Sequence, residues 1–120
     1  MVQTTDKVSP DIPEKPQRNG GARIVVTYKG KRIAKYRLAK RRIMIGRRHD
    51  CDIRINSRSA SRHHAQIFSV LDQDFVLDLD SKNGTFVNAR RIKKHTLENG
   101  DTISIGGFDL AFSRTPQDLP

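Results

Sequence analysis

Three short segments of the 120-residue chain carry polar side chains suited to holding an anion. Arg47, which follows Gly46 at the end of an apolar run, offers a planar fork of charged donors that matches two oxygens of a phosphate or carboxylate. Ser61 offers a hydroxyl, and Asn83 offers an amide that can donate and accept at once. Gly46 and Gly84 stand beside these residues, where the absence of a side chain lets another backbone come close. The pattern predicts a site for an anion carried on an extended backbone.

The elements that must position this site are short strands. From Arg23 onward, β-branched or aromatic runs alternate with turn residues, and no segment keeps apolar residues at helical spacing. Lys29-Gly30 separates the first two runs as a hairpin turn, because glycine accepts the positive φ of such turns. Many short strands at this spacing predict an all-β fold, a sandwich of two antiparallel sheets. The expected strands are residues 23–28, 31–38, 41–46, 51–55, 63–70, 74–79, 85–88, 90–94, 101–106 and 108–113.

Alternation along these runs also predicts the core, since every second residue of a strand points to the same side of its sheet. The polar residues of interest then lie in the connections, where a rigid β scaffold presents its binding groups. The residues assigned to the core are Ile43, Ile45, Ile53, Ile55, Ala65, Ile67, Val76, Ile103 and Ile105.

Composition divides the chain into one domain and two tails. Residues 1–21 are rich in Pro, Thr and charge and end in Asn19-Gly20-Gly21, which predicts a flexible N-terminal tail. The sandwich is expected over residues 22–114, and residues 115–120 form a C-terminal tail. No apolar run reaches the roughly 20 residues that span a bilayer, and the N-terminus lacks the apolar region of a secretory signal. We therefore expect a cytoplasmic protein with no membrane partner.

Cysteine and histidine usage predicts neither a metal nor another cofactor. Cys51 is the single cysteine and is interpreted as a packing thiol. His63 and His64 are adjacent, and neighbours in a strand point to opposite faces, so they cannot jointly hold one ion.

Positive charge is the strongest feature of the composition. The formal net charge is +10, and residues 23–48 contain eleven Lys or Arg and no acid. Such an excess fits an anionic partner, which could be nucleic acid, a membrane surface or a phosphorylated protein, or simply a solvated surface.

Four segments, "GRRHDCDI", "SRHHA", "DLDSKNGTFVN" and "LENGDTISIG", resemble in order and spacing the motifs of the forkhead-associated (FHA) domain family. The family pattern is Gly-Arg, Ser-Arg-x-His, Asn-Gly-Thr-x-x-Asn and Leu-x-x-Gly-Asp-x-Ile-x-Ile-Gly. The resemblance covers about residues 23–113. It implies an eleven-stranded β-sandwich whose loops bind phosphothreonine in a partner protein, in signalling downstream of a Ser/Thr protein kinase.

The resemblance also implies individual roles. It assigns the phosphate to Arg47 and Ser61, makes Arg62 a second cationic contact, and gives Asn83 the backbone of the bound peptide. Lys82 departs from the family, in which Ser or Thr often stands at this position. Its ammonium could reach the same phosphate oxygens or point into water.

Other residues are implied to support the site or to select its ligand. In the family, the histidine of Ser-Arg-x-His braces the loops by hydrogen bonding. The residues expected to give such structural support are Gly46, His64, Gly84 and Thr85. The segment implied to select residues after the phosphothreonine is Asn88, Ala89 and Arg90.

Two other functions were weighed against this interpretation. A nucleic-acid binder would use residues 23–48 with 90–95, but few aromatics are available to stack on bases. Only non-specific, salt-sensitive binding is expected from it. An enzyme would use Ser61, His64 and Asp78 or Asp80, but a three-residue offset rarely lets serine and imidazole meet productively, and no nucleophile-elbow glycines surround Ser61. We therefore expect no catalysis.

The tails contain threonines that the domain itself could bind once they are phosphorylated. Thr4 and Thr5 lie in the N-terminal tail, and Thr115 precedes Asp118 by three residues. Recognition of these residues would be a self-recognition of the chain.

Overall fold

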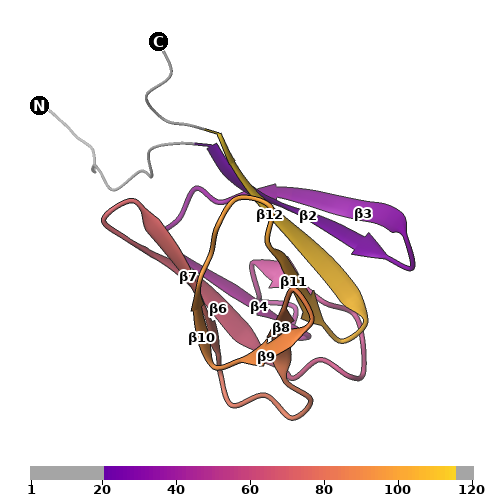
Figure 1. Ribbon diagram of the computed structural model, residues 1–120. Coiled ribbons are helices and arrows are strands. Elements are labelled where there is room, and N and C mark those ends of the chain that lie inside the picture. The colour runs from indigo at the N-terminus through magenta and orange to yellow at the C-terminus, as the bar shows by residue number, and fades with distance from the viewer. Residues whose placement is uncertain (1–20, 116–120) are drawn as a thin grey trace, which may run out of the picture.

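A computed structural model describes residues 21–115, which form two β-sheets packed face to face (Figure 1). The five-stranded sheet has the order β10 (Lys94–Thr96), β7 (Gln73–Asp78), β6 (Ala65–Val70), β4 (Arg42–Gly46) and β5 (Ile53–Arg54). The six-stranded sheet has the order β3 (Lys31–Arg37), β2 (Gly21–Tyr28), β12 (Phe108–Thr115), β11 (Thr102–Ile105), β8 (Thr85–Val87) and β9 (Arg90–Ile92). The all-β sandwich of about eleven strands is confirmed.

The threonines considered for self-recognition differ in whether they lie within residues 21–115. Thr4 and Thr5 lie outside the described residues, whereas Thr115 is the last residue of β12 and pairs with Gly21 at the start of β2. No helix within the described range is long and apolar enough to cross a membrane.

The hairpin predicted at Lys29-Gly30 is present. Tyr28 pairs with Lys31, and the two residues between them have φ of 52° and 79°. Positive φ at both central positions is typical of a type I′ turn, whose twist matches the twist of the two flanking strands.

Alternation of side chains builds the core between the two sheets, as predicted. Ile45, Ile55 and Ile67 have 0% exposure, and every residue assigned to the core from the sequence is buried. Cys51 is buried with a free thiol, in line with its interpretation as a packing residue.

Two details differ from the expected strands. β4 and β5 pair in parallel, with Ile45 opposite Ile53, so the sheets are not wholly antiparallel. The run 90–94, expected as one strand, breaks at Lys93: β9 pairs with β8 in the six-stranded sheet, and β10 pairs with β7 in the five-stranded sheet. The chain crosses between the sheets at that residue.

Candidate functional site

Three connections meet at Ser61. They are the first loop (residues 47–52, between β4 and β5), the second loop (55–64, between β5 and β6) and the third loop (79–84, between β7 and β8). The Ser61 carbonyl accepts the Arg47 N–H at 3.0 Å, and its hydroxyl oxygen accepts the Lys82 N–H at 3.0 Å. No acceptor among residues 21–115 takes the hydroxyl hydrogen, so it remains available to donate to a ligand. Ser61 thus joins the loops and presents a donor.

Arg47 is fixed at one edge of its guanidinium and open at the other. Its Nε donates to the Ala60 carbonyl at 3.0 Å, while the residue as a whole is exposed. No acceptor among the described residues engages its terminal nitrogens. A guanidinium held in this way can place two parallel N–H donors on one anion.

Gly46 explains how closely the first two loops approach each other. A Cβ at Gly46 would overlap the carbonyl oxygen of Arg62, which also accepts the Arg48 N–H at 3.2 Å. Only glycine leaves this space empty, so it permits the contact that holds Arg47 beside Ser61.

His64 joins the second loop to the third from inside the protein, with 0% exposure. Its Nδ1 lies 2.9 Å from the Ser61 backbone nitrogen, and its Nε2 lies 2.8 Å from the Gly84 carbonyl oxygen. A backbone N–H can only donate and a carbonyl can only accept, so the ring accepts at Nδ1 and donates from Nε2. Both ring nitrogens of a neutral imidazole are therefore satisfied.

Asp78 holds the third loop together by hydrogen bonds, a role that was not predicted from the sequence. Its carboxylate accepts hydrogen bonds from the Ser81 N–H and hydroxyl and from the buried Thr85 hydroxyl at 2.6 Å. The Ser81 hydroxyl oxygen in turn accepts the Gly84 N–H at 3.0 Å. Desolvation acts to raise the pKa of Asp78, but the Ser81 and Thr85 hydrogen bonds outweigh it and the pKa lies below its ordinary value. The signal was the spacing of Asp and Ser by three residues, which is typical of a side chain that closes a turn.

Asn83, Lys82 and Arg62 complete the polar surface around Ser61. The Asn83 Nδ2 donates to the Ser59 carbonyl at 2.9 Å, which leaves the amide oxygen able to accept. Lys82 and Arg62 are exposed, and their side chains have no hydrogen-bond or ion-pair partner among the described residues. Both side chains are therefore cations without a counter-ion in the described part of the chain.

Gly84 is constrained in two ways. Its φ is +93°, a conformation that favours glycine, and an added Cβ would lie 2.8 Å from the Arg91 Nε. The third loop therefore closes directly beneath an arginine side chain.

Asn88 and Ala89 form the turn between β8 and β9, where both have positive φ, and Arg90 is the first residue of β9. The Asn88 side chain donates to Asp101 at 2.9 Å and accepts the Thr102 N–H at 3.0 Å. Both ends of its amide are thus used within the fold. Among the described residues, no hydrogen bond joins this turn to the three loops, so the role of residues 88–90 in selecting ligand residues stays a prediction.

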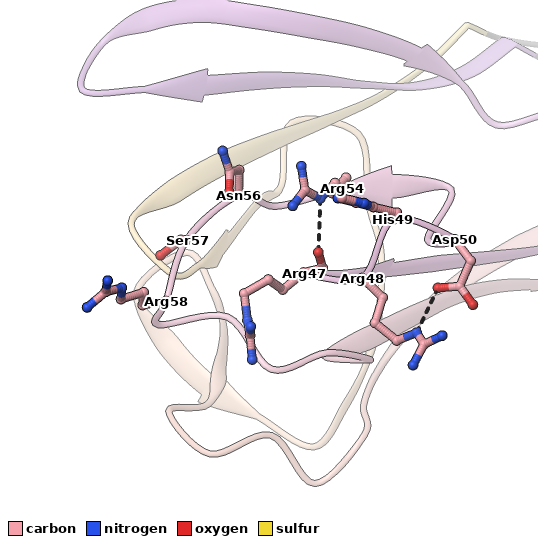
Figure 2. Close-up of a pocket in the computed structure, with 8 residues that line it drawn as sticks. All are labelled: Arg47, Arg48, His49, Asp50, Arg54, Asn56, Ser57 and Arg58. Atoms are coloured by element: carbon pink, nitrogen blue, oxygen red, sulfur yellow. Dashed lines mark hydrogen bonds and ion pairs between the residues drawn. The ribbon is translucent and has the colours of Figure 1, made fainter.

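A hollow of about 620 Å³ opens beside Arg47 (Figure 2). It extends along the first loop, β5 and the start of the second loop. Its lining residues are Arg47, Arg48, His49, Asp50, Arg54, Asn56, Ser57 and Arg58.

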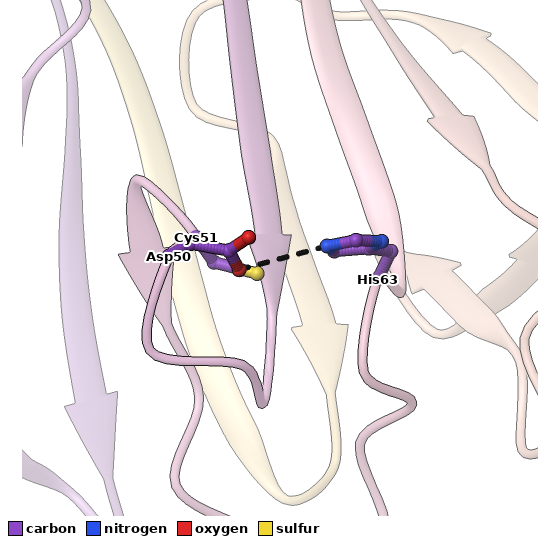
Figure 3. Close-up of side chains that lie close together, drawn as sticks. All are labelled: Asp50, Cys51 and His63. Atoms are coloured by element: carbon purple, nitrogen blue, oxygen red, sulfur yellow. Dashed lines mark ion pairs between the residues drawn. The ribbon is translucent and has the colours of Figure 1, made fainter.

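Asp50, a lining residue of this hollow, lies close to Cys51 and His63, with possible metal-ligand atoms of the three within 4.8 Å of one another (Figure 3). This cluster was not predicted from the sequence, where only the adjacent pair His63 and His64 was considered as a metal site. The thiol donates to the Arg62 carbonyl at 3.3 Å, and burial with the nearby Asp50 carboxylate raises the pKa of Cys51. The cluster offers three donors of the kinds that zinc accepts, one fewer than a closed site requires. In this structure, its thiol joins the first loop to the second.

Comparison with known proteins identifies the family. The FHA domain family matches residues 43–106, the range that contains all three loops. The chain belongs to the FHA domain family. It is 35% identical over 98 residues to the oxoglutarate dehydrogenase inhibitor of Corynebacterium efficiens, a match that covers 81% of this chain and 68% of the relative. Over 73 residues it is 40% identical to the glycogen accumulation regulator GarA of Mycobacterium tuberculosis, covering 60% of this chain and 44% of GarA.

A solved structure with the same fold covers slightly more of this chain than these two relatives do. Mycobacterium tuberculosis EmbR, in complex with a low-affinity phosphopeptide, aligns with a TM-score of 0.73 and 33% identity, over 83% of this chain and 26% of EmbR. Other curated relatives are much longer, and the chain spans only 8% and 5% of two of them. The region similar to this chain is thus a small part of these two relatives.

Proposed function

We propose that this FHA domain is a non-enzymatic module that binds phosphothreonine in a partner protein, downstream of a Ser/Thr protein kinase in the cytoplasm. One observation carries the proposal: Arg47 and Ser61 present unused donors side by side on loops that Gly46 and His64 hold together. Donors fixed before the ligand arrives lose little conformational entropy on binding.

The chemistry of phosphothreonine fits these donors. Its phosphate carries about −1.5 to −2 charges near neutral pH and three acceptor oxygens. The Arg47 fork would bind two of these oxygens and the Ser61 hydroxyl the third, with Arg62 and Lys82 adding positive charge. The Asn83 amide would bind the peptide backbone. Preference for threonine over serine would rest on one methyl group, worth about 0.8 kcal/mol when buried.

Known proteins support the proposal at two points. The EmbR structure contains a phosphopeptide. A second solved structure, from work on phosphothreonine-dependent FHA domain interactions, aligns with a TM-score of 0.73 and 26% identity. Nothing in these relatives favours the alternative of non-specific nucleic-acid binding.

An oriented library of phosphothreonine peptides, screened against the purified chain, tests the proposal. Peptides that bind should be re-synthesised with phosphothreonine, phosphoserine or unmodified threonine and compared by calorimetry. We expect binding in the order phosphothreonine, phosphoserine, threonine, with the last undetectable. Equal binding of the phosphorylated and unmodified peptides would contradict the proposal.

A further inference from the structure

Asp50, Cys51 and His63 bring three different metal-ligand atoms together where the first loop meets the second. Asp50 and Cys51 belong to the first loop and His63 to the second, and their oxygen, sulfur and nitrogen atoms all lie within 4.8 Å of one another. In Figure 3 the Asp50 carboxylate and the Cys51 thiol lie side by side and face the His63 ring. The proposed phosphopeptide contacts use none of these three side chains.

The distances within this cluster are close to those of a tetrahedral zinc site. Zinc binds imidazole and carboxylate at about 2.0–2.2 Å and thiolate at about 2.3 Å, so its ligand atoms lie roughly 3.3–3.6 Å apart. The His63 Nε2 and the Asp50 Oδ1 are already 3.6 Å apart. The distances from these atoms to the Cys51 Sγ are at most 4.8 Å, so each has to close by roughly 1 Å to reach zinc geometry. Rotation of the exposed Asp50 and His63 side chains can supply a movement of this size.

The cluster is open to solvent on one side and closed on the other. The side chains of Asp50 and His63 are 60% and 46% exposed, whereas Cys51 is only 8% exposed. An ion can therefore arrive through the carboxylate and the imidazole and meet the thiol beneath them. Thiolate and imidazole suit zinc and similar ions, whereas magnesium and calcium prefer oxygen ligands. A water molecule would complete the coordination, as in zinc sites with three protein ligands.

The thiol would change its partner when an ion binds. It now donates to the Arg62 carbonyl at 3.3 Å, and burial together with the carboxylates of Asp50 and Asp52 raises the pKa of Cys51. The thiol is therefore protonated near neutral pH, and zinc would bind it as thiolate with release of the proton to solvent. Arg48, whose Nε lies 3.2 Å from the Asp50 Oδ1, would give up that contact to the doubly charged ion.

We propose that Asp50, Cys51 and His63 bind one zinc ion, or a similar thiophilic divalent cation, that joins the first loop to the second. The ion would replace the hydrogen bond from the thiol to the Arg62 carbonyl with coordination across the same two loops. The inference does not depend on the proposed function, because its ligands are not phosphopeptide contacts.

Titrations of the reduced, chelator-treated chain with Zn²⁺ and Co²⁺ test the inference. Calorimetry with Zn²⁺ near neutral pH should show one ion per chain, whatever the protein concentration. Co²⁺ occupies sites of the same ligand type and is coloured, so it should give the near-ultraviolet charge-transfer band of a cobalt thiolate. This band reports coordination by sulfur, which a cysteine used only for packing would not produce.

Variants of the two exposed ligands locate the ion and should leave the fold intact. His63→Gln removes one ligand, and Asp50→Asn removes the charge of another. Each should weaken zinc binding about tenfold or more, since loss of a group that merely orients a metal ligand already costs about 10–100-fold. Cys51→Ser should abolish the cobalt thiolate band. His49→Gln, which removes an exposed histidine of the same loop outside the cluster, is the matched control and should bind zinc as tightly as wild type.

The inference fails if the wild-type chain binds no zinc, or if it binds cobalt without the thiolate band. It also fails if His63→Gln binds zinc as tightly as wild type, or if His49→Gln loses as much affinity as His63→Gln. A stoichiometry of one ion for two chains would contradict a site within one chain. Should Cys51→Ser not fold, His63→Gln and Asp50→Asn still decide the question, because both side chains are exposed.

Discussion

Gly46 shows how one residue determines the geometry of the site. Gly46→Ala would push its Cβ into the Arg62 carbonyl, so the first and second loops must separate. We expect a loss of about 1–3 kcal/mol in the free energy of unfolding, typical of overpacking, together with weaker phosphopeptide binding. Chemical denaturation and calorimetry measure the two effects.

Gly30→Ala is the matched control for this prediction. Gly30 has φ of +79° and open space around it, so alanine there strains only the β2–β3 turn. It should lower stability without changing phosphopeptide affinity. Equal affinity losses in the two variants would show that binding follows overall stability and not the contact at Gly46.

His64 provides a second test at the residue scale. His64→Ala leaves the Ser61 N–H and the Gly84 carbonyl without their partner, at a cost of about 1–3 kcal/mol for each buried group left unsatisfied. The melting temperature should fall, and binding should weaken because Ser61 loses its support. A variant that melts like wild type yet fails to bind would make His64 a ligand contact instead.

At the scale of elements, the third loop should be sensitive to acid through Asp78. Its pKa is lowered in the folded state, because the Ser81 and Thr85 hydrogen bonds outweigh desolvation. A lowered folded pKa means that the stabilisation is present above the unfolded pKa of about 3.9 and is lost as pH falls through the folded pKa. Asp78→Asn should therefore be less stable than wild type at pH 7, and this difference should shrink below about pH 4.

Denaturation of both proteins between pH 7 and pH 2.5 checks this prediction. Asp52 and Asp101 also have lowered pKa values, so the pH dependence of wild-type stability combines the contributions of several carboxylates. The difference between the two proteins isolates Asp78. A difference that stays constant over the whole range would mean that the carboxylate charge does not hold the loop.

The elements themselves were largely predictable from local patterns. Period-two alternation located the strands and the buried isoleucines, and Lys29-Gly30 identified the hairpin. The parallel pair β4–β5 was not predictable, because the direction of pairing depends on the path of the first loop in three dimensions. The break at Lys93 leaves no mark in the sequence, because residues 90–94 contain one apolar residue and no glycine, proline or other turn-forming residue.

The site was predictable only in part, because some of its contacts form only when the loops fold and leave no local pattern in the sequence. Arg47, Ser61 and Asn83 stood out by residue type and by resemblance to the family. Asp78 was considered only as part of an enzyme, because its contacts with Ser81 and Thr85 form when the third loop folds back on itself. The side-chain partners of Asn88 are Asp101 and Thr102, more than ten residues away, immediately before β11 and at its first residue.

Across the whole molecule, the basic strand β3 and the candidate site belong to different sheets. β3, with exposed Lys31, Arg32 and Lys35, is one of the two edge strands of the six-stranded sheet, whereas Arg47 follows β4 in the five-stranded sheet. Arg32→Gln combined with Lys35→Gln should therefore weaken any association with DNA at low salt and reduce its salt dependence. Phosphopeptide affinity should stay within twofold of wild type. A larger loss of phosphopeptide binding would place the ligand on β3.

The most direct test of the account is the affinity of Arg47→Ala for a phosphothreonine peptide that binds the wild-type chain, measured by calorimetry beside the melting temperature of each protein. Charge-assisted hydrogen bonds contribute about 1.5–3 kcal/mol each, so binding should weaken at least tenfold. The fold should persist, because the Arg47 side chain is exposed and makes one hydrogen bond within residues 21–115. Arg47→Lys keeps the positive charge but loses the two parallel donors of the guanidinium, so its affinity for the phosphopeptide should lie between those of wild type and Arg47→Ala. A folded Arg47→Ala protein that binds the phosphopeptide as tightly as wild type would contradict the account.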